Sequence, residues 1–142
     1  MEFIGNASLH IMGSRSFQGM GAYWQTSADP FAPPMNQIPK AVFSRQGPAI
    51  LGGMNTTAVL DAAEIAKLKA QEGKPIIAHG GVSFARSLVT QELVDQFALI
   101  VAPVALGKGL PLFSELAAPA PLKLMSSKAF PGGAVAQIYR SA

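Results

Sequence analysis

Cysteine is absent from this chain of 142 residues, and histidine occurs only at His10 and His79. Without cysteine the protein cannot form disulfide bonds, thiolate zinc sites or a cysteine nucleophile. Two imidazoles are few ligands for a transition metal, so we expect neither a metal site nor metal-dependent catalysis.

Charged residues are also scarce: they make up 13% of the sequence, and the formal net charge is +3. The eleven Lys and Arg residues are scattered singly, without a basic run or interleaved aromatic residues. This pattern does not favour nucleic-acid binding. Isolated cations suit a small anionic ligand, whose phosphates can be held by backbone amides and single arginines.

Long apolar runs are missing as well, because no segment reaches the roughly 18 apolar residues that a membrane span requires. The N-terminus has no positively charged region followed by an apolar stretch, so we expect a cytoplasmic protein with no membrane partner. Hydrophobic residues nevertheless make up 49% of the chain. That fraction is enough to bury a core in a single domain over 1–142, and it makes self-association plausible.

Strand-like and helix-like patterns alternate along the sequence, which predicts an α/β fold. A mostly parallel sheet would be flanked by helices and followed by a C-terminal antiparallel β-hairpin. Four prolines indicate a loop over 23–39. Asp61 is the expected N-cap of one helix. The other expected elements are strands over 9–12, 40–44, 76–78 and 97–104, helices over 14–20 and 83–91, and a hairpin formed by 122–130 and 134–139.

Two adjacent glycines, Gly80 and Gly81, lie where a predicted strand passes into a predicted helix. Without a Cβ on either residue, a pyrophosphate could approach the backbone, and the amides of Val82, Ser83 and Phe84 would point toward it. A pair of glycines can equally make a tight turn without any ligand, so this motif needs support from elsewhere in the chain.

That support comes from Gly13, Ser14, Arg15 and Ser16, which have the same strand-to-helix context. Ligands of parallel sheets bind where strands end and helices begin, so the two helix starts are expected to face one ligand. Arg15 could pair with a phosphate, although a lone arginine is more often a solvated surface residue. Ser44 and Arg45 end a third strand at the same edge, with the same two interpretations.

Next to the glycines, His79 ends a predicted buried strand. A hydrogen-bonded structural histidine is the favoured interpretation, because no carboxylate lies near it in the sequence to orient it as a base.

Five segments in the right order resemble the dihydrofolate-reductase-like family that includes the reductase domain of bacterial riboflavin biosynthesis. They are "IMGSRSFQGMGAYW", "PKAVFSR", "LKAQEGKPIIAHGGVSFARSL", "LVDQFALIVAPVALGKGLPLF" and "FPGGAVAQIYR", and the resemblance covers about 7–140.

The resemblance implies a central mixed sheet and NADPH-dependent reduction of a small molecule such as a pterin or a ribosylaminopyrimidine. It assigns Gly13, Arg15 and Ser16 to the first cofactor turn and Ser44 and Arg45 to the segment beside the adenosine. The implied pyrophosphate turn consists of Gly80, Gly81, Val82, Ser83 and Phe84. No catalytic proton donor can be assigned.

Two features depart from the family. Its first turn usually reads Gly-Arg-x-Thr followed by Tyr or Phe, whereas Ser14 occupies the arginine position here and Arg15 is displaced by one residue. Both NADPH and NADH therefore stay open. Family members also begin earlier, with a strand that carries a Ser-Leu-Asp-Gly-like motif and lies between the strands that match 76–78 and 97–102. We expect those two strands to pair directly, or a partner chain to fill the gap.

These departures keep alternatives open. The chain could be a degenerate family member that acts as a nucleotide-binding or dimeric scaffold, or a flavin- or nucleotide-binding protein with unrelated chemistry. Because the 97–104 strand and the terminal hairpin are apolar, we also expect a homodimer that covers them.

Overall fold

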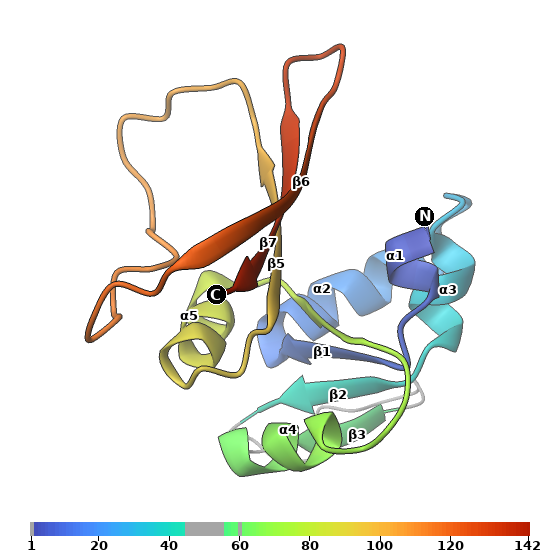
Figure 1. The fold of residues 1–142 in the computed structure, drawn as a ribbon. Helices are drawn as coiled ribbons and strands as arrows, with labels where there is room; N and C mark the ends of the chain where they lie inside the picture. The colour runs from blue at the N-terminus through green and yellow to red at the C-terminus, as the bar shows by residue number, and fades with distance from the viewer. Residues whose placement is uncertain (1, 45–55, 60) are drawn as a thin grey trace. The chain divides into compact units, whose positions relative to one another are not determined.

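A computed structural model describes residues 2–44, 56–59 and 61–142, and Figure 1 shows the arrangement of their helices and strands. The chain divides into two compact units, Met1–Ala85 and Arg86–Ala142, which are described in turn. A single domain over the whole chain stays a prediction. In the described ranges the longest helix, α2, has 11 residues, which is too few to cross a bilayer.

The first unit contains a four-stranded parallel sheet, which confirms the expected α/β architecture. Its strands lie in the order β3-β2-β1-β4, and each neighbouring pair is parallel. Helix α2 packs against β1 and β2, and α3 packs against α1 and α2. The strands are β1 (Leu9–Gly13), β2 (Lys40–Phe43), β3 (Thr56–Val59) and β4 (Ile76–His79); the helices are α1 (Glu2–Gly5), α2 (Ser14–Trp24), α3 (Ala32–Gln37), α4 (Ala62–Lys69) and α5 (Val82–Thr90), which continues into the second unit.

One face of this sheet forms the core with α2. Met12 on β1, Val42 on β2 and Phe17 on α2 are buried together, and Met20 packs against them. Residues paired across parallel strands point to the same face, so His10 and Lys40 lie on the Met12 face as well. The core of the first unit therefore contains basic side chains among its apolar ones.

The loop expected over 23–39 was wrong in its middle, where α3 forms. The Asp29 carboxylate accepts a hydrogen bond from the Phe31 amide at 2.8 Å, and the Ala32 amide donates to the Asp29 carbonyl at 2.8 Å. Pro33 and Pro34 follow in the first turn of the helix. Proline is tolerated there because amides of the first turn have no partner within the helix.

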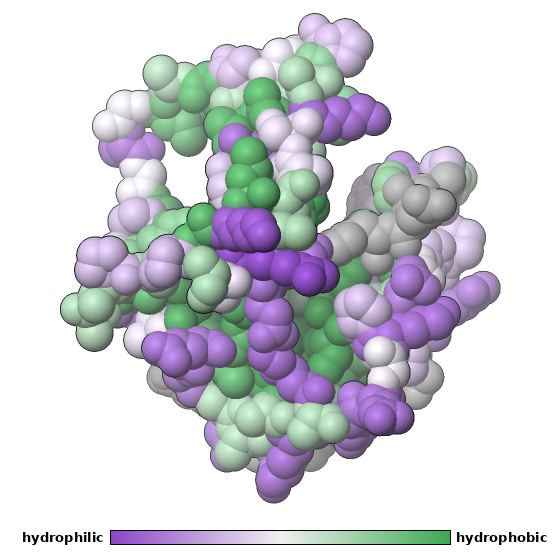
Figure 2. Space-filling view, viewed as in Figure 1, coloured by the Kyte–Doolittle hydropathy of each residue, from purple (hydrophilic) through white to green (hydrophobic). Residues whose placement is uncertain are grey.

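The second unit contains the antiparallel sheet β5-β7-β6, and its hairpin of β6 (Leu122–Ala129) and β7 (Val135–Ser141) confirms the expected C-terminal hairpin. Met125 is an extra residue in β6, because Leu124 pairs with Tyr139 while Ser126 pairs with the next residue, Ile138. This is a β-bulge. Large apolar side chains stay exposed on this unit, and Figure 2 shows hydrophobic residues across its visible surface.

Strand β5 (Gln96–Val101) is shorter than expected and has a different neighbour. It ends before Pro103, which cannot donate a backbone hydrogen bond to a sheet. It pairs with β7, whereas β4 pairs with β1 in the other sheet. Among the described residues each is an edge strand of its own sheet, and the expectation that β4 and β5 pair directly, or that a partner chain fills the gap between them, stays a prediction.

The start of α4 confirms the predicted cap and gives a stability prediction. The Asp61 side chain accepts a hydrogen bond from the Glu64 amide at 3.0 Å. We expect Asp61→Ala to lower the free energy of unfolding by about 1 kcal/mol, because a helix-start amide loses its partner. Urea denaturation measures the change. Asp61→Asn, which can still cap, should lose much less, and equal losses in the two variants would contradict this role.

Candidate functional site

The carboxyl ends of β1, β2 and β4 meet at one edge of the parallel sheet, which we call the carboxyl edge. Gly13 ends β1, Ser44 follows β2, and Gly80 follows β4. Since the three strands are neighbours and parallel, their ends must lie side by side. The expectation that these segments share an edge is confirmed for the described residues, whereas Arg45 lies outside them.

Gly80 and Gly81, together called the glycine turn, occupy positions where the backbone conformation and a close neighbour both favour glycine. Both have positive φ angles, +49° and +75°, which residues with a Cβ rarely adopt. A Cβ added at Gly80 would lie 3.2 Å from the Ser16 Oγ, and one at Gly81 would lie 3.3 Å from it. The glycine turn and the first turn of α2 therefore approach each other so closely that only glycine fits without displacement.

Two helices begin beside this turn. Gly13 is the N-cap of α2 and supplies no side-chain hydrogen bond to the first amides, and no acidic residue lies in the first turn of that helix. The first turn of α5 also lacks an acidic residue. The first amides of a helix have no partner within it and carry a partial positive charge. The carboxyl edge thus offers amides suited to an anion.

The predicted site residues differ in exposure. Phe84 is buried and packs against Phe43, with ring centroids 5.6 Å apart, so its side chain belongs to the core and not to a ligand site. Ser44 is also buried, and its side chain is 4% exposed. Ser16 and Val82 are partly exposed, while the exposed members of the set are Arg15, Gly80, Gly81 and Ser83.

A cluster of three basic residues, the buried His10 and Lys40 and the partly buried His79, lies in the same sheet and was not recognised from the sequence. Across the strands Lys40 pairs with His10, and His79 with Met12, so the three basic side chains share a face. The rings of His10 and His79 lie 4.5 Å apart between centroids in an edge-on arrangement. The three residues lie far apart in the sequence, and only the strand register brings them together.

The imidazoles of this cluster are poorly satisfied. Both ring nitrogens of His10 and the Nε2 of His79 are buried without a hydrogen-bond partner among the described residues. The interpretation of His79 as a hydrogen-bonded histidine was therefore wrong for Nε2. The pKa of His79 is lowered to about 4, mainly by burial and in addition by the neighbouring His10 and Lys40. Burial also lowers the pKa of His10; the nearby Ile4 carbonyl opposes this, and Lys40 adds to it.

Lys40 is buried but well bonded. Its Nζ donates to the Ile38 carbonyl at 2.7 Å and to the Asn36 carbonyl at 3.5 Å, both at the end of α3. Cations are favoured at this end of a helix because its last carbonyls carry partial negative charge. Burial lowers the Lys40 pKa. Its role in the structure is to fasten α3 to β2.

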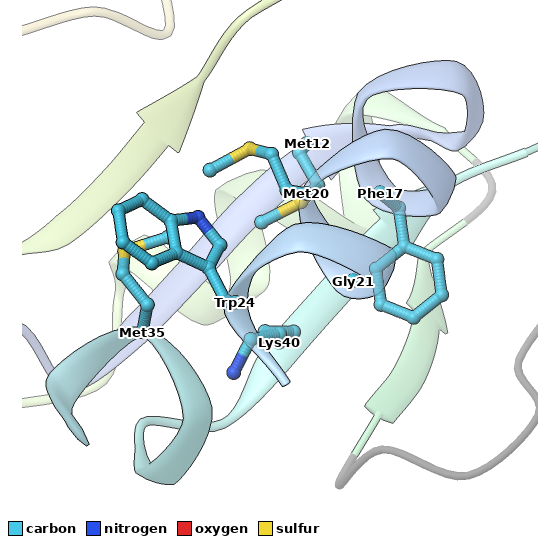
Figure 3. Close-up of a pocket in the computed structure, with 7 residues that line it drawn as sticks. All are labelled: Met12, Phe17, Met20, Gly21, Trp24, Met35 and Lys40. Carbon is cyan, nitrogen blue, oxygen red and sulfur yellow. The ribbon is translucent and has the colours of Figure 1, made fainter. Parts of the chain in front are cut away.

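A cavity of about 10 Å³ lies between α2, α3 and the sheet. Figure 3 shows side chains from these elements around it, and apart from Lys40 they are apolar. A volume of this size holds at most one water molecule. A dinucleotide does not fit there. The lining residues are Met12, Phe17, Met20, Gly21, Trp24, Met35 and Lys40.

The close approach of the glycine turn to Ser16 can be tested by substitution. We expect Gly81→Ala to lower the free energy of unfolding by about 1 to 2 kcal/mol, the cost of a side chain in the left-handed region. Adding Ser16→Ala should recover part of the loss because it removes the Oγ. Urea denaturation measures both. Gly109→Ala is the control, since nothing lies within 4 Å of a Cβ there, and a loss of equal size in that variant would contradict the argument.

The buried imidazoles predict that stability depends on pH. Unfolded His79 titrates near 6.5 and folded His79 near 4, so the unfolded chain binds more protons between these values. The free energy of unfolding should be constant above pH 6.5 and fall by up to about 3 kcal/mol as the pH drops to 4. Urea denaturation across this range measures the fall. His79→Gln should flatten the profile, and an unchanged slope in that variant would rule out His79 as the cause.

Comparison with known proteins supports these observations. Residues 6–136 match the model of the RibD C-terminal domain. "Uncharacterized protein YyaP" of Bacillus subtilis (strain 168) is 31% identical over 148 residues, covering 97% of this chain and 76% of that protein. "Uncharacterized protein YwjB" of the same organism is 37% identical over 65 residues, covering 46% of this chain and 37% of its own length.

Solved structures show the same fold. A putative riboflavin biosynthesis protein from Shewanella sp. PV-4 has a TM-score of 0.71 at 19% identity, covering 99% of this chain and 77% of that one. Dihydrofolate reductase from Enterococcus faecalis, complexed with NADP(H) and RAB-propyl, has a TM-score of 0.64 at 13% identity, covering 94% and 73%. The fold is dihydrofolate-reductase-like, and the chain belongs to the RibD C-terminal domain family.

Proposed function

We propose that this protein binds NADPH at the carboxyl edge and uses it to reduce a small heterocyclic molecule, such as a pterin or a ribosylaminopyrimidine. The observation that carries the proposal is the glycine turn. Two left-handed glycines pack so closely against Ser16 that an added Cβ would displace its hydroxyl, beside two helix starts without acidic residues. Close backbone approach and the first amides of a helix are what a pyrophosphate requires.

In this proposal the backbone from Gly80 to Phe84 holds the pyrophosphate, and Ser83 adds a hydroxyl. Gly13, Ser16 and the exposed Arg15 form the opposite wall of the phosphate site. Ser44 lies beside the adenosine, and Arg45, which the family resemblance assigns to the same segment, lies outside the described residues. When bound, NADPH supplies the hydride from its nicotinamide ring, and the protein's part is to bind and orient it.

Family membership supports a reductase. The family's name refers to RibD, and two of its structural neighbours are a pyrimidine reductase-like protein from Corynebacterium diphtheriae and the NADP(H) complex of an Enterococcus faecalis dihydrofolate reductase. The geometry of the carboxyl edge supports an anion site but does not select the substrate. We place the reaction in the cytoplasm and connect it with riboflavin biosynthesis or a related reduction.

A second candidate is a nucleotide-binding scaffold without catalysis. It is favoured by a lack of acidic side chains in the described part of the chain. No acidic residue lies in the first turn of α2 or α5, where serine supplies the hydroxyl groups of the proposed edge. A reduction that adds a proton to its product needs a donor near the reacting atom. A protein that binds NADPH but turns over no pterin or ribosylaminopyrimidine substrate would fit this candidate.

Calorimetric titration with NADPH, and then with NADH, tests the binding proposal. We expect micromolar binding of NADPH, and at least a tenfold loss of affinity in Gly81→Val, because a branched side chain would fill the phosphate position. Circular dichroism checks that this variant is folded. No heat with either nucleotide would overturn the proposal.

Arg15 can be tested in the same experiment. We expect Arg15→Ala to weaken NADPH binding about five- to tenfold, as removal of a charged hydrogen-bonding group costs about 1 to 1.5 kcal/mol. Lys67→Ala serves as the charge control, because Lys67 on α4 is an exposed cation like Arg15. Equal losses in the two variants would show that only the overall charge matters.

A further inference from the structure

The last residue of β4 joins the basic cluster to the glycine turn. His79 ends β4, and Gly80 follows it directly. The imidazole of His79 lies on the face of the sheet that carries Met12, while its backbone continues into the turn. A charge on this ring is therefore one residue away from the backbone that the proposed site offers to an anion.

The surroundings of His79 oppose a positive charge. Its ring contacts that of His10, with 4.5 Å between the centroids, and Lys40 lies on the same face. His10 is fully buried, and Lys40 is 3% exposed. Burial and then these two bases lower the pKa of His79. The imidazole is therefore neutral at neutral pH, because a proton on it would add a second charge beside that of Lys40.

The elements around the cluster do not supply a compensating carboxylate. All four strands of the parallel sheet lack acidic residues, as do α2, α3 and α5. Helix α1 acts on His10 through the backbone carbonyl of Ile4. The carboxylate of Glu64 on α4 is exposed and pairs with Lys67 at 3.1 Å. A negative charge that stabilises a proton on His79 must therefore come from a ligand.

We propose that an anion bound at the glycine turn is bound together with a proton on His79, so that occupancy of the site and protonation of the imidazole favour each other. The inference rests on the proposed function, because it concerns the same anion site. A phosphate brings the charge that the surrounding elements lack, and an opposite charge at about 4 to 6 Å shifts a pKa by about 1 to 3 units toward the charged form. The coupling is reciprocal, so the protonated protein binds the anion more tightly by the same factor.

The chain has only two histidines, so NMR follows each imidazole separately. We expect the pKa of His79, about 4 in the free protein, to rise by about one unit when NADP⁺ saturates the site. His79→Gln identifies the signal. Sodium chloride at equal ionic strength is the control and should shift the pKa much less. An unchanged pKa with NADP⁺ bound would overturn this inference and leave the proposed function standing, whereas an absence of NADP⁺ binding would overturn both.

Calorimetry counts the proton directly. A group whose pKa rises from about 4 to about 5 takes up about half a proton on binding at pH 4.5. We expect the wild type to take up about half a proton more than His79→Gln when NADP⁺ binds, measured in two buffers of different ionisation enthalpy. The comparison cancels protons exchanged by the ligand itself, and circular dichroism checks that both proteins are folded at this pH. Equal proton uptake by the wild type and the variant would overturn the inference.

Discussion

Parallel pairing of β1 with β2 on one side and with β4 on the other is the constraint on which the candidate site depends. The three strands are short, and a different segment of the candidate site follows or ends each of them. Their pairing brings Gly13, Ser44 and the glycine turn to one edge although they lie far apart in the sequence. The same register that sets this edge also aligns the two helix starts, so the geometry of the proposed anion site follows from backbone hydrogen bonds before any side chain contributes.

That register has a second effect on the interior of the first unit. It places Lys40, His10 and His79 on one face, where burial disfavours the charged form of each. Lys40 is compensated by the carbonyls at the end of α3, but the imidazoles are not compensated to the same degree. Buried polar groups without partners cost stability, and this cluster adjoins the glycine turn through His79. Stability and site geometry therefore depend on the same few residues.

Local chemistry made part of this structure predictable from the sequence. The glycine turn, the Asp61 cap and the terminal hairpin are specified by neighbouring residues, and each was recognised. Helix α3 was missed because prolines at 33 and 34 indicate a loop unless the preceding turn at Asp29 is known. The cluster of His10, Lys40 and His79 could not be inferred, because it depends on which strands pair and in which register. Contacts between distant segments carry no local signal in a single sequence.

The bulge at Met125 decides on which side of the second sheet the charges lie. Side chains alternate along a strand, so Lys123 and Lys128 would point to opposite sides of a regular β6. The extra residue reverses the alternation, and both lysines lie on the side of Arg140, while Leu122 and Leu124 face the other way with Phe97 and Tyr139. Position 125 therefore matters because it adds one residue to β6, and its side chain matters less. Natural variation should permit many residue types there, but a deletion would move the side chains of one half of the strand to the opposite face of the sheet.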